Sequence, residues 1–188
     1  MKIGICGRSG SGKSTASMYF QEKGYTVIDL DQLTKGLDKK YPEIILRVID
    51  TFGFEYVSDG KINRKMLGEL VFSSQKELNK LNEIYFEYIK KDVLKEISRI
   101  ENIVVEGAIL FEIELEKYLD KTIYMVTDER TLLERISHRE KNTVETLKNR
   151  LKIQKKYDAY QNKADYIIET NSTKEELYEK LDQLRVSP

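Results

Sequence analysis

The sequence predicts a three-layer α/β/α fold built around a parallel β-sheet. Five short apolar segments, each flanked by polar residues or glycine, are typical of buried parallel strands. Helical patterns lie between these segments, and strands that alternate with helices form an open sheet with helices on both faces and right-handed crossovers. The expected strands are residues 3–6, 26–28, 103–105, 122–126 and 166–168.

The clearest helical pattern lies between residues 78 and 100. Apolar residues recur there at steps of three and four, which places them on one face of a helix that packs against the core. The residues that form this stripe are Leu78, Leu81, Tyr85, Ile89, Val93, Ile97 and Ile100. The whole stretch from about 34 to 100 is expected to be helical, with a turn at Ser58-Asp59-Gly60.

Length and composition indicate one domain. The chain has 188 residues, 2 prolines and no Gly/Ser-rich linker at which it would divide. We expect a core at 1–33, 101–134 and 160–188. A helical insertion at about 34–100 and a basic segment at about 135–159 interrupt that core, and they are the places where we expect substrate specificity.

Charge and residue counts exclude several classes of protein. Lys+Arg and Asp+Glu each total 32, and this neutral balance argues against nucleic-acid coating and polybasic membrane binding. The apolar start of the chain is too short for a signal peptide, so we expect a cytoplasmic protein. One cysteine, Cys6, and one histidine, His138, exclude an internal disulfide and Cys/His metal clusters. Nothing in the sequence indicates an oligomeric state.

The strongest functional signal is a phosphate-binding loop. Residues 7–15, Gly-Arg-Ser-Gly-Ser-Gly-Lys-Ser-Thr, satisfy Gly-x4-Gly-Lys-[Ser/Thr] between an expected strand and an expected helix. Backbone N–H groups and the helix dipole would hold the phosphates of ATP, with Lys13 at the β- and γ-phosphates and Ser14 on magnesium. The alternative is a glycine-rich turn without a ligand. The residues predicted to bind the nucleotide are Gly7, Ser9, Gly10, Ser11, Gly12, Lys13, Ser14 and Thr15.

Carboxylates follow two of the predicted strands. Asp29 and Asp31 end the second strand and Glu106 ends the third, at the sheet edge where α/β proteins bind ligands. Phosphoryl transfer needs a carboxylate near the acceptor hydroxyl, so all three are candidates to face the substrate. Structural roles stay open: Asp31 could cap a helix that starts at Gln32, Asp29 could order the loop, and Glu106 could be exposed. Glu106 could also hold Lys13, an arginine or, through water, magnesium.

A phosphate-binding loop also occurs in GTPases, motors and transport ATPases. The short chain favours a small-molecule kinase instead. In such an enzyme the basic segment would form a lid, with Arg135 and Arg139 clamping the phosphates as the lid closes and excludes water.

Further segments identify a family. The loop and Asp29-Leu30-Asp31 are followed in order by Asp59-Gly60-Lys61-Ile62-Asn63-Arg64, Val71-Phe72-Ser73, Leu81-Asn82, Leu110-Phe111-Glu112, Leu133-Glu134-Arg135 to Arg139, Arg150 with Gln154, and Ala164-Asp165-Tyr166. This order resembles the dephospho-coenzyme A kinases across nearly the whole chain.

The resemblance implies a P-loop kinase that uses ATP and magnesium to phosphorylate the 3′-hydroxyl of dephospho-coenzyme A, giving coenzyme A and ADP. It implies that Asp31 is the general base, that Lys13 and Ser14 serve the nucleotide and magnesium, and that Arg139 is the lid arginine. Arg64 would lie on the acceptor side, within a helical acceptor-binding insertion.

The sequence departs from the family pattern in four places. Phe86-Glu87 replace His-Pro, Glu106-Gly107-Ala108-Ile109-Leu110 replace Asp-x-Pro-Leu-Leu, Arg8-Ser9 replace Gly-Ile, and Glu140 replaces Asp. The piece Val105-Glu106-Gly107 is also similar to uridine-kinase-like enzymes. Two alternatives therefore stay open: a nucleoside or nucleoside monophosphate kinase with a divergent acceptor site, and a nucleotide-binding regulatory protein.

Overall fold

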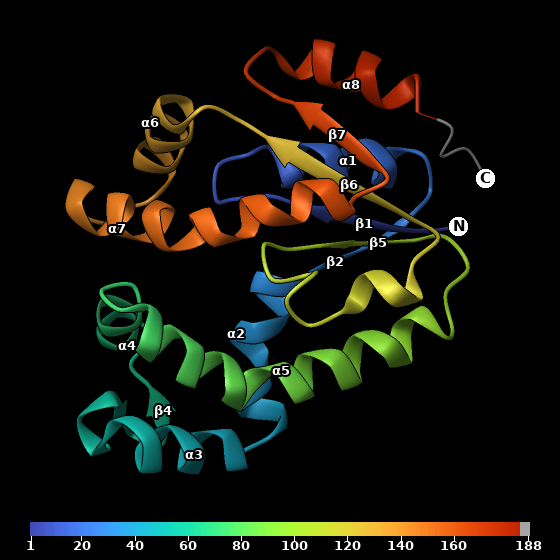
Figure 1. Ribbon diagram of the computed structural model, residues 1–188. Helices are drawn as coiled ribbons and strands as arrows, with labels where there is room; N and C mark the ends of the chain where they lie inside the picture. Colours follow the sequence, from blue (N-terminus) through green and yellow to red (C-terminus); the bar gives the residue numbers. More distant parts are fainter. Residues whose placement is uncertain (185–188) are drawn as a thin grey trace.

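A computed structural model describes residues 1–184 and shows the predicted three-layer α/β architecture (Figure 1). The central sheet has five parallel strands in the order β2-β5-β1-β6-β7. All five predicted strands are confirmed, each one residue longer than expected. Their bounds are β1 Lys2–Cys6, β2 Thr26–Asp29, β5 Ile103–Glu106, β6 Lys121–Val126 and β7 Tyr166–Glu169.

The strand register brings the predicted functional residues to one edge of the sheet. Ile5 pairs with Glu106, and Glu106 in turn pairs with Asp29 on its other side. The carboxyl ends of β1, β2 and β5 therefore lie together. The phosphate-binding loop leaves β1 at this same edge, which is where ligands bind in open α/β sheets.

Different helices cover the two faces of the sheet. On one face, α1 (Lys13–Glu22) and α8 (Lys174–Asp182) pack over a core that includes Ile3, Ile5 and Val104. On the other face, α2 (Leu30–Lys40) and α5 (Gln75–Ile97) pack over Cys6, Val105 and Tyr124. Figure 1 shows these two helical layers above and below the sheet.

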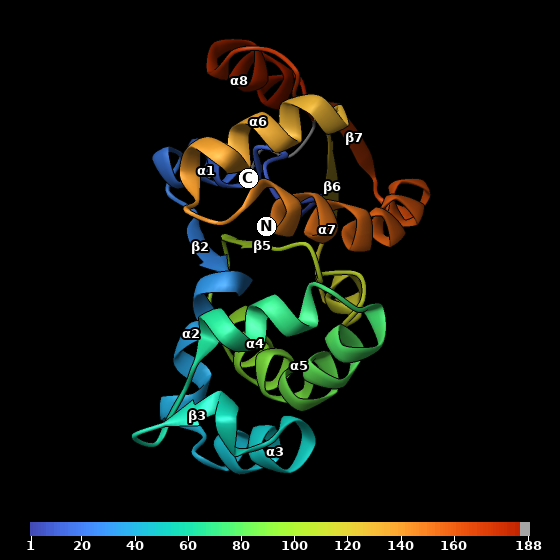
Figure 2. The same ribbon diagram turned by 90° about the vertical axis from the view of Figure 1, so that its left-hand side faces the viewer.

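The insertion after β2 forms a helical lobe on the second face (Figure 2). It consists of α2, α3 (Glu43–Phe52), a short 3-10 helix at Phe54–Tyr56, the hairpin strands β3 (Val57–Ser58) and β4 (Lys61–Ile62), α4 (Arg64–Val71) and α5. The predicted turn is the tip of this hairpin. Asp59 and Gly60 both have positive φ, 51° and 68°, which is typical of a two-residue hairpin turn. No sequence pattern predicts the hairpin, because each of its strands has only two residues.

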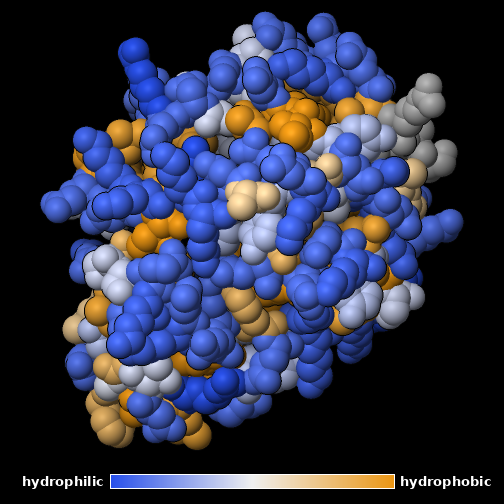
Figure 3. Space-filling model, viewed as in Figure 1, coloured by the Kyte–Doolittle hydropathy of each residue, from blue (hydrophilic) through white to orange (hydrophobic). Residues whose placement is uncertain are grey.

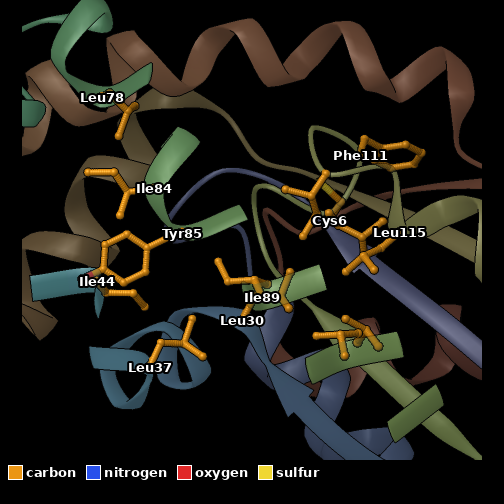
Figure 4. Packing of buried hydrophobic residues seen from close by; sticks show 14 of the residues in the cluster. Cys6, Leu30, Leu37, Ile44, Leu78, Ile84, Tyr85, Ile89, Phe111 and Leu115 are labelled. Atoms are coloured by element: carbon orange, nitrogen blue, oxygen red, sulfur yellow. The ribbon is translucent and has the colours of Figure 1, made fainter. Parts of the chain in front are cut away.

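The predicted apolar stripe is confirmed as the buried face of α5. Ile89 of this helix lies beside Leu30 of α2 and Tyr85 lies near Leu37, while Leu78 belongs to the same hydrophobic core (Figure 4). The last residue of the stripe, Ile100, lies beyond the end of the helix and packs against the same core.

The basic segment forms two helices and a 3-10 helix. They are α6 (Glu129–Arg139), α7 (Val144–Gln154) and Lys155–Lys163. Asp128 caps α6 by accepting from Thr131 N, and Thr143 caps α7 by accepting from Thr146 N. The expected boundaries at 33/34 and 134/135 thus fall inside α2 and α6.

The face of the molecule in Figure 3 is largely hydrophilic. In the part of the chain that the structure describes, no helix has the length and apolar character that a membrane span requires.

Candidate active site

The phosphate-binding loop turns from the end of β1 into α1, and two glycines make that turn possible. Gly10 has φ 83°, and a Cβ there would lie 3.0 Å from the carbonyl oxygen of Leu132. Gly12 has φ 89° and is the N-cap of α1. No side chain caps this helix, so its first-turn N–H groups are available to an anion.

Lys13 and Ser14 begin α1. Lys13 Nζ donates to the carbonyl oxygen of Arg8 at 3.1 Å, so the ammonium lies over the loop. Ser14 Oγ donates to Glu106 Oε2 at 3.4 Å. The magnesium ligand and the ammonium group predicted from the sequence are thus held on one side of the loop, next to the end of β5.

Glu106 is buried, with only 4% of its surface exposed, so the alternative of an exposed strand-end carboxylate is wrong. Burial raises the pKa of Glu106 to about 7. The charge of Lys13 and the bond from Ser14 act in the opposite direction, while the nearby Asp29 carboxylate adds to the rise. The geometry places Glu106 behind the loop rather than in solvent.

Asp29 and Asp31 have different environments. Asp29 is the N-cap of α2: its Oδ1 accepts from Asp31 N at 2.8 Å and from Gln32 N at 3.0 Å. The alternative that Asp31 caps this helix is therefore wrong. Asp31 is exposed in the first turn of α2. It lines the cavity described below without a side-chain hydrogen bond to any described residue.

A cavity of about 940 Å³ lies between the loop, the insertion and the basic helices. Twelve of the predicted site residues line it: Ser9, Gly10, Gly12, Lys13, Ser14, Thr15, Asp29, Asp31, Arg64, Glu106, Arg135 and Arg139. Gly7 and Ser11 belong to the loop but do not line the cavity. The insertion contributes mainly apolar walls, which include Leu67, Phe72, Leu81, Tyr85 and Phe86.

The two predicted lid arginines lie on α6 and have different partners. Arg135 donates to the carbonyl oxygen of Gly10 at 3.3 Å and to that of Thr170 at 2.6 Å. It thereby joins the phosphate-binding loop to the segment between β7 and α8. Arg139 is 60% exposed and donates to Glu140 at 3.1 Å.

Arg64, expected on the acceptor side, lies at the start of α4. Its Nη2 donates to Asp38 Oδ1 at 2.6 Å and to the carbonyl oxygen of Lys35 at 2.8 Å. Asp38 is buried in α2, so the guanidinium is held against that helix.

Two residues of α7, Arg150 and Gln154, line the cavity although the sequence predicts no role for either of them. Arg150 donates to both carboxylate oxygens of Glu140, at 2.9 and 2.7 Å, and lies 5.0 Å from the ring centroid of Phe72. Gln154 accepts from Ser9 N at 2.9 Å and donates to Ser9 Oγ at 3.1 Å. Two features of the sequence could have indicated these site residues: the basic composition of the segment and the spacing of Arg150 and Gln154, which is typical of the family.

The segment that joins β7 to α8 was missed altogether. Thr170, Ser172, Thr173 and Lys174 line the cavity beside the phosphate-binding loop. No pattern in the sequence marks this stretch, and only the strand order, with β7 next to β6, brings it to the site.

The fold and the site define a class of protein: a P-loop kinase of small molecules. The family model described as dephospho-CoA kinase matches residues 1–176, and the chain belongs to that family.

Individual relatives agree with this assignment. A dephospho-CoA kinase from Fusobacterium nucleatum is 35% identical over 188 residues, which cover 97% of this chain and 96% of the relative. The crystal structure of TT1252 from Thermus thermophilus is 28% identical, with a TM-score of 0.77 over 97% of this chain and 94% of that one. The fold is shared with a dephospho-CoA kinase from Campylobacter jejuni, at 24% identity and a TM-score of 0.66 over 97% and 96% of the two chains.

Proposed function

We propose that this protein transfers the γ-phosphoryl group of ATP to the 3′-hydroxyl of dephospho-coenzyme A, giving coenzyme A and ADP. Membership of the family supports this reaction. The observation that carries the proposal is the cavity, in which the phosphate-binding loop and Asp31 share one space with the apolar walls of the insertion. A donor and an acceptor can therefore meet there. We expect the enzyme to act in the cytoplasm on small molecules alone.

The donor phosphates would lie on the loop. Backbone N–H groups of residues 10–15 and the N-terminus of α1 supply partial positive charge, and Lys13 adds a full charge. Ser9 is instead hydrogen-bonded to Gln154, which accepts from the Ser9 N–H and donates to the Ser9 hydroxyl. Arg135, held at Gly10 and Thr170, would close the donor side.

Magnesium fits this site. The described residues contain no group of three or more carboxylate, histidine or cysteine ligands that could hold a metal. Magnesium in kinases instead takes one or two protein oxygens together with phosphates and waters. Ser14 Oγ and the adjacent Glu106 carboxylate, directly or through water, are oxygens of that kind. When bound, the ion would neutralise charge on the phosphates.

The chain's own residues would do the rest. Asp31 would accept a hydrogen bond from the 3′-hydroxyl and orient its oxygen toward the γ-phosphorus. As the bond from the 3′-oxygen to phosphorus forms, the bond from phosphorus to the β–γ bridging oxygen breaks, and the hydroxyl proton passes to the Asp31 carboxylate. Lys13 and Arg139 would stabilise the charge on the transferring group. The basic helices would exclude water, which would otherwise accept the phosphoryl group.

The second candidate is a nucleoside or nucleoside monophosphate kinase. Phe86 and Ala108 favour it, because both residues line the cavity at positions where the chain departs from the family pattern.

A coupled assay of ADP release tests both candidates. Purified protein with ATP and magnesium is given dephospho-coenzyme A, a panel of nucleosides and nucleoside monophosphates, or no acceptor. We expect turnover that depends on dephospho-coenzyme A and a product with one added 3′-phosphate by mass spectrometry. Turnover only with the panel would overturn the proposal in favour of the second candidate. ATP binding without any turnover would favour a regulatory protein.

A further inference from the structure

Arg8 is a charged residue of the phosphate-binding loop that the proposed mechanism does not use. It stands at one of the places where the sequence departs from the family pattern. Its side chain is only 12% exposed, yet it does not line the large cavity. Arg8 instead lines a second cavity of about 20 Å³, together with Tyr124 and Asp158. We therefore expect no direct contact between this guanidinium and the phosphates of the donor.

Carboxylates of the basic segment balance the charge of Arg8. Arg8 Nε lies 3.2 Å from Asp158 Oδ1, and Nη1 lies 3.7 Å from Glu129 Oε1. Asp158 is the stronger partner, because it is half-buried and closer, whereas Glu129 is exposed and screened by solvent. Tyr124, which is buried in β6, donates to the same Asp158 oxygen at 3.2 Å. The guanidinium is thus fixed, since leaving a buried cation without its partner is costly.

The backbone of Arg8 holds Lys13. The Arg8 carbonyl oxygen accepts from Lys13 Nζ and from Ser11 N, both at 3.1 Å. The loop residues on either side, Gly7 and Gly10, have positive φ and no side chain that could fix the backbone. The position of the Lys13 ammonium therefore depends on where Arg8 is held.

Two residues of the basic segment contact consecutive residues of the loop. Gln154 ends α7 and holds Ser9, and Asp158, four residues further in the 3-10 helix, holds Arg8. The contact of Gln154 is made by a neutral amide, whereas the contact of Asp158 is an ion pair. Only the residue in the ion pair also accepts from Lys13.

We propose that the ion pair between Arg8 and Asp158 positions Lys13: it fixes the Arg8 carbonyl oxygen and thereby places the ammonium where the β- and γ-phosphates of the donor bind. The inference rests on the proposed function for the identity of the donor, ATP. Arg8 is a positioning residue, because it acts through Lys13 and does not touch the nucleotide. A guanidinium that attracted phosphates by its charge alone would respond in the opposite way when Asp158 is neutralised.

Isothermal titration of the whole protein with ATP and magnesium, without acceptor, tests the proposal. Arg8→Met should weaken ATP binding about tenfold, because a displaced ammonium contacts the phosphates poorly. Asp158→Asn should weaken it as well, although this variant removes a negative charge near the loop. Arg130→Met is the matched control: it removes an arginine from an exposed ion pair with Glu134 on α6, and should bind ATP as the wild type does.

A double-mutant cycle with Lys13→Met shows whether Arg8 acts through Lys13. In the Lys13→Met protein, the further change Arg8→Met should alter ATP affinity less than about twofold. Tyr124→Phe keeps the ring in the core and removes one hydrogen bond to Asp158, so it tests the same ion pair even if Arg8→Met does not fold. We expect it to weaken ATP binding about two- to threefold.

Three outcomes overturn the inference. Arg8→Met could bind ATP as tightly as the wild type, Asp158→Asn could bind it equally or more tightly, or Arg8→Met could cause the same tenfold loss with and without Lys13. Failure of the proposed function is distinguishable, because it is seen in the wild type as an absence of dephospho-coenzyme A turnover, whereas these titrations contain no acceptor.

Discussion

Glu140 and Arg150 are joined by two parallel hydrogen bonds, from Nη1 to Oε1 at 2.9 Å and from Nη2 to Oε2 at 2.7 Å. The pair links the end of α6 to α7, and the Arg150 guanidinium lies over the ring of Phe72 from the insertion. This is the place where the basic helices meet the acceptor lobe. Arg139 contacts the same carboxylate, so Glu140 holds two arginines of the cavity wall.

The Glu140–Arg150 pair makes the free energy of unfolding depend on pH in the acid range. Burial acts to raise the pKa of Glu140, but the hydrogen bonds and charges of Arg150 and Arg139 outweigh it and hold the pKa at about 2, below the ordinary 4.5. Between these values the unfolded chain binds a proton that the folded chain does not. The free energy of unfolding should therefore decline as pH falls from 4.5 toward 2.

Glu140→Gln should remove this dependence. A lowering of the Glu140 pKa from 4.5 to about 2 corresponds to about 3 kcal/mol in the free energy of unfolding. Because solvent reaches the pair, we expect Glu140→Gln to lower the free energy of unfolding at pH 7 by about 1–2 kcal/mol. Denaturant unfolding at pH 7, 4.5 and 3 measures the effect: the difference between wild type and variant should narrow as pH falls. Glu83→Gln, exposed and unpaired on α5, serves as the control and should leave the wild-type dependence in place. A difference that stays constant across this range would contradict the prediction.

Gly107 keeps α2 close to β5. A Cβ on Gly107 would lie 2.7 Å from Leu30 Cδ1 and 2.8 Å from Leu30 Cβ, and Leu30 is the buried first residue of α2. Gly107→Ala should thus displace the start of α2, lowering the free energy of unfolding by about 1–3 kcal/mol. Turnover should decrease as well, because Asp31 moves with Leu30.

Gly36→Ala is the matched control for Gly107→Ala. Gly36 lies within α2, and a Cβ added there would meet no atom within 4 Å. Gly36→Ala should therefore raise the free energy of unfolding by about 0.5–1 kcal/mol. Thermal unfolding and the ADP-release assay measure both variants. A Gly107→Ala protein as stable and active as the wild type would show that α2 can shift without effect.

The amide of Gln154 links α7 to the phosphate-binding loop through Ser9. Gln154→Leu leaves Ser9 N–H without its partner, and we expect a loss of about 1–3 kcal/mol in stability and a KM for ATP several-fold higher. Ser9→Ala removes only the hydroxyl bond and should cost less, about 0.5–1.5 kcal/mol. The two variants are compared by denaturant unfolding and by ATP titration of the steady-state rate. An unchanged KM for ATP in Gln154→Leu would mean that the loop holds its shape without this tether.

The main elements could be predicted because their signals are local. Each strand contains a short apolar run, and the three inner strands β1, β5 and β6 are largely buried, whereas the edge strands β2 and β7 are partly exposed. The stripe of α5 repeats over many turns. The hairpin of β3 and β4 was missed because two-residue strands carry no periodicity. The phosphate-binding loop was found because its function is encoded in contiguous residues.

The rest of the site depends on contacts between distant residues. Asp29, rather than Asp31, caps α2, and neighbouring aspartates of the same type give no local cue to which of them does so. Ser9 and Gln154 are 145 positions apart, and only the packing of α7 on the loop brings them together. A sequence pattern can therefore supply the residue types of the site, but not which of them are already paired.

Asp31 is the residue on which the proposed chemistry depends. Its carboxylate is unpaired at the start of α2, whereas Asp29 is occupied by two backbone N–H groups. Asp31→Asn keeps the shape of the side chain but cannot accept the proton, so kcat should fall by on the order of 10² to 10⁴. The KM for ATP should change little, because the loop binds the donor. Asp50→Asn, exposed on α3, is the control for loss of a helical carboxylate. Steady-state rates with dephospho-coenzyme A decide the matter: a kcat equal to that of the wild type would exclude Asp31 as the base, and the nearby Glu106 would become the group to test.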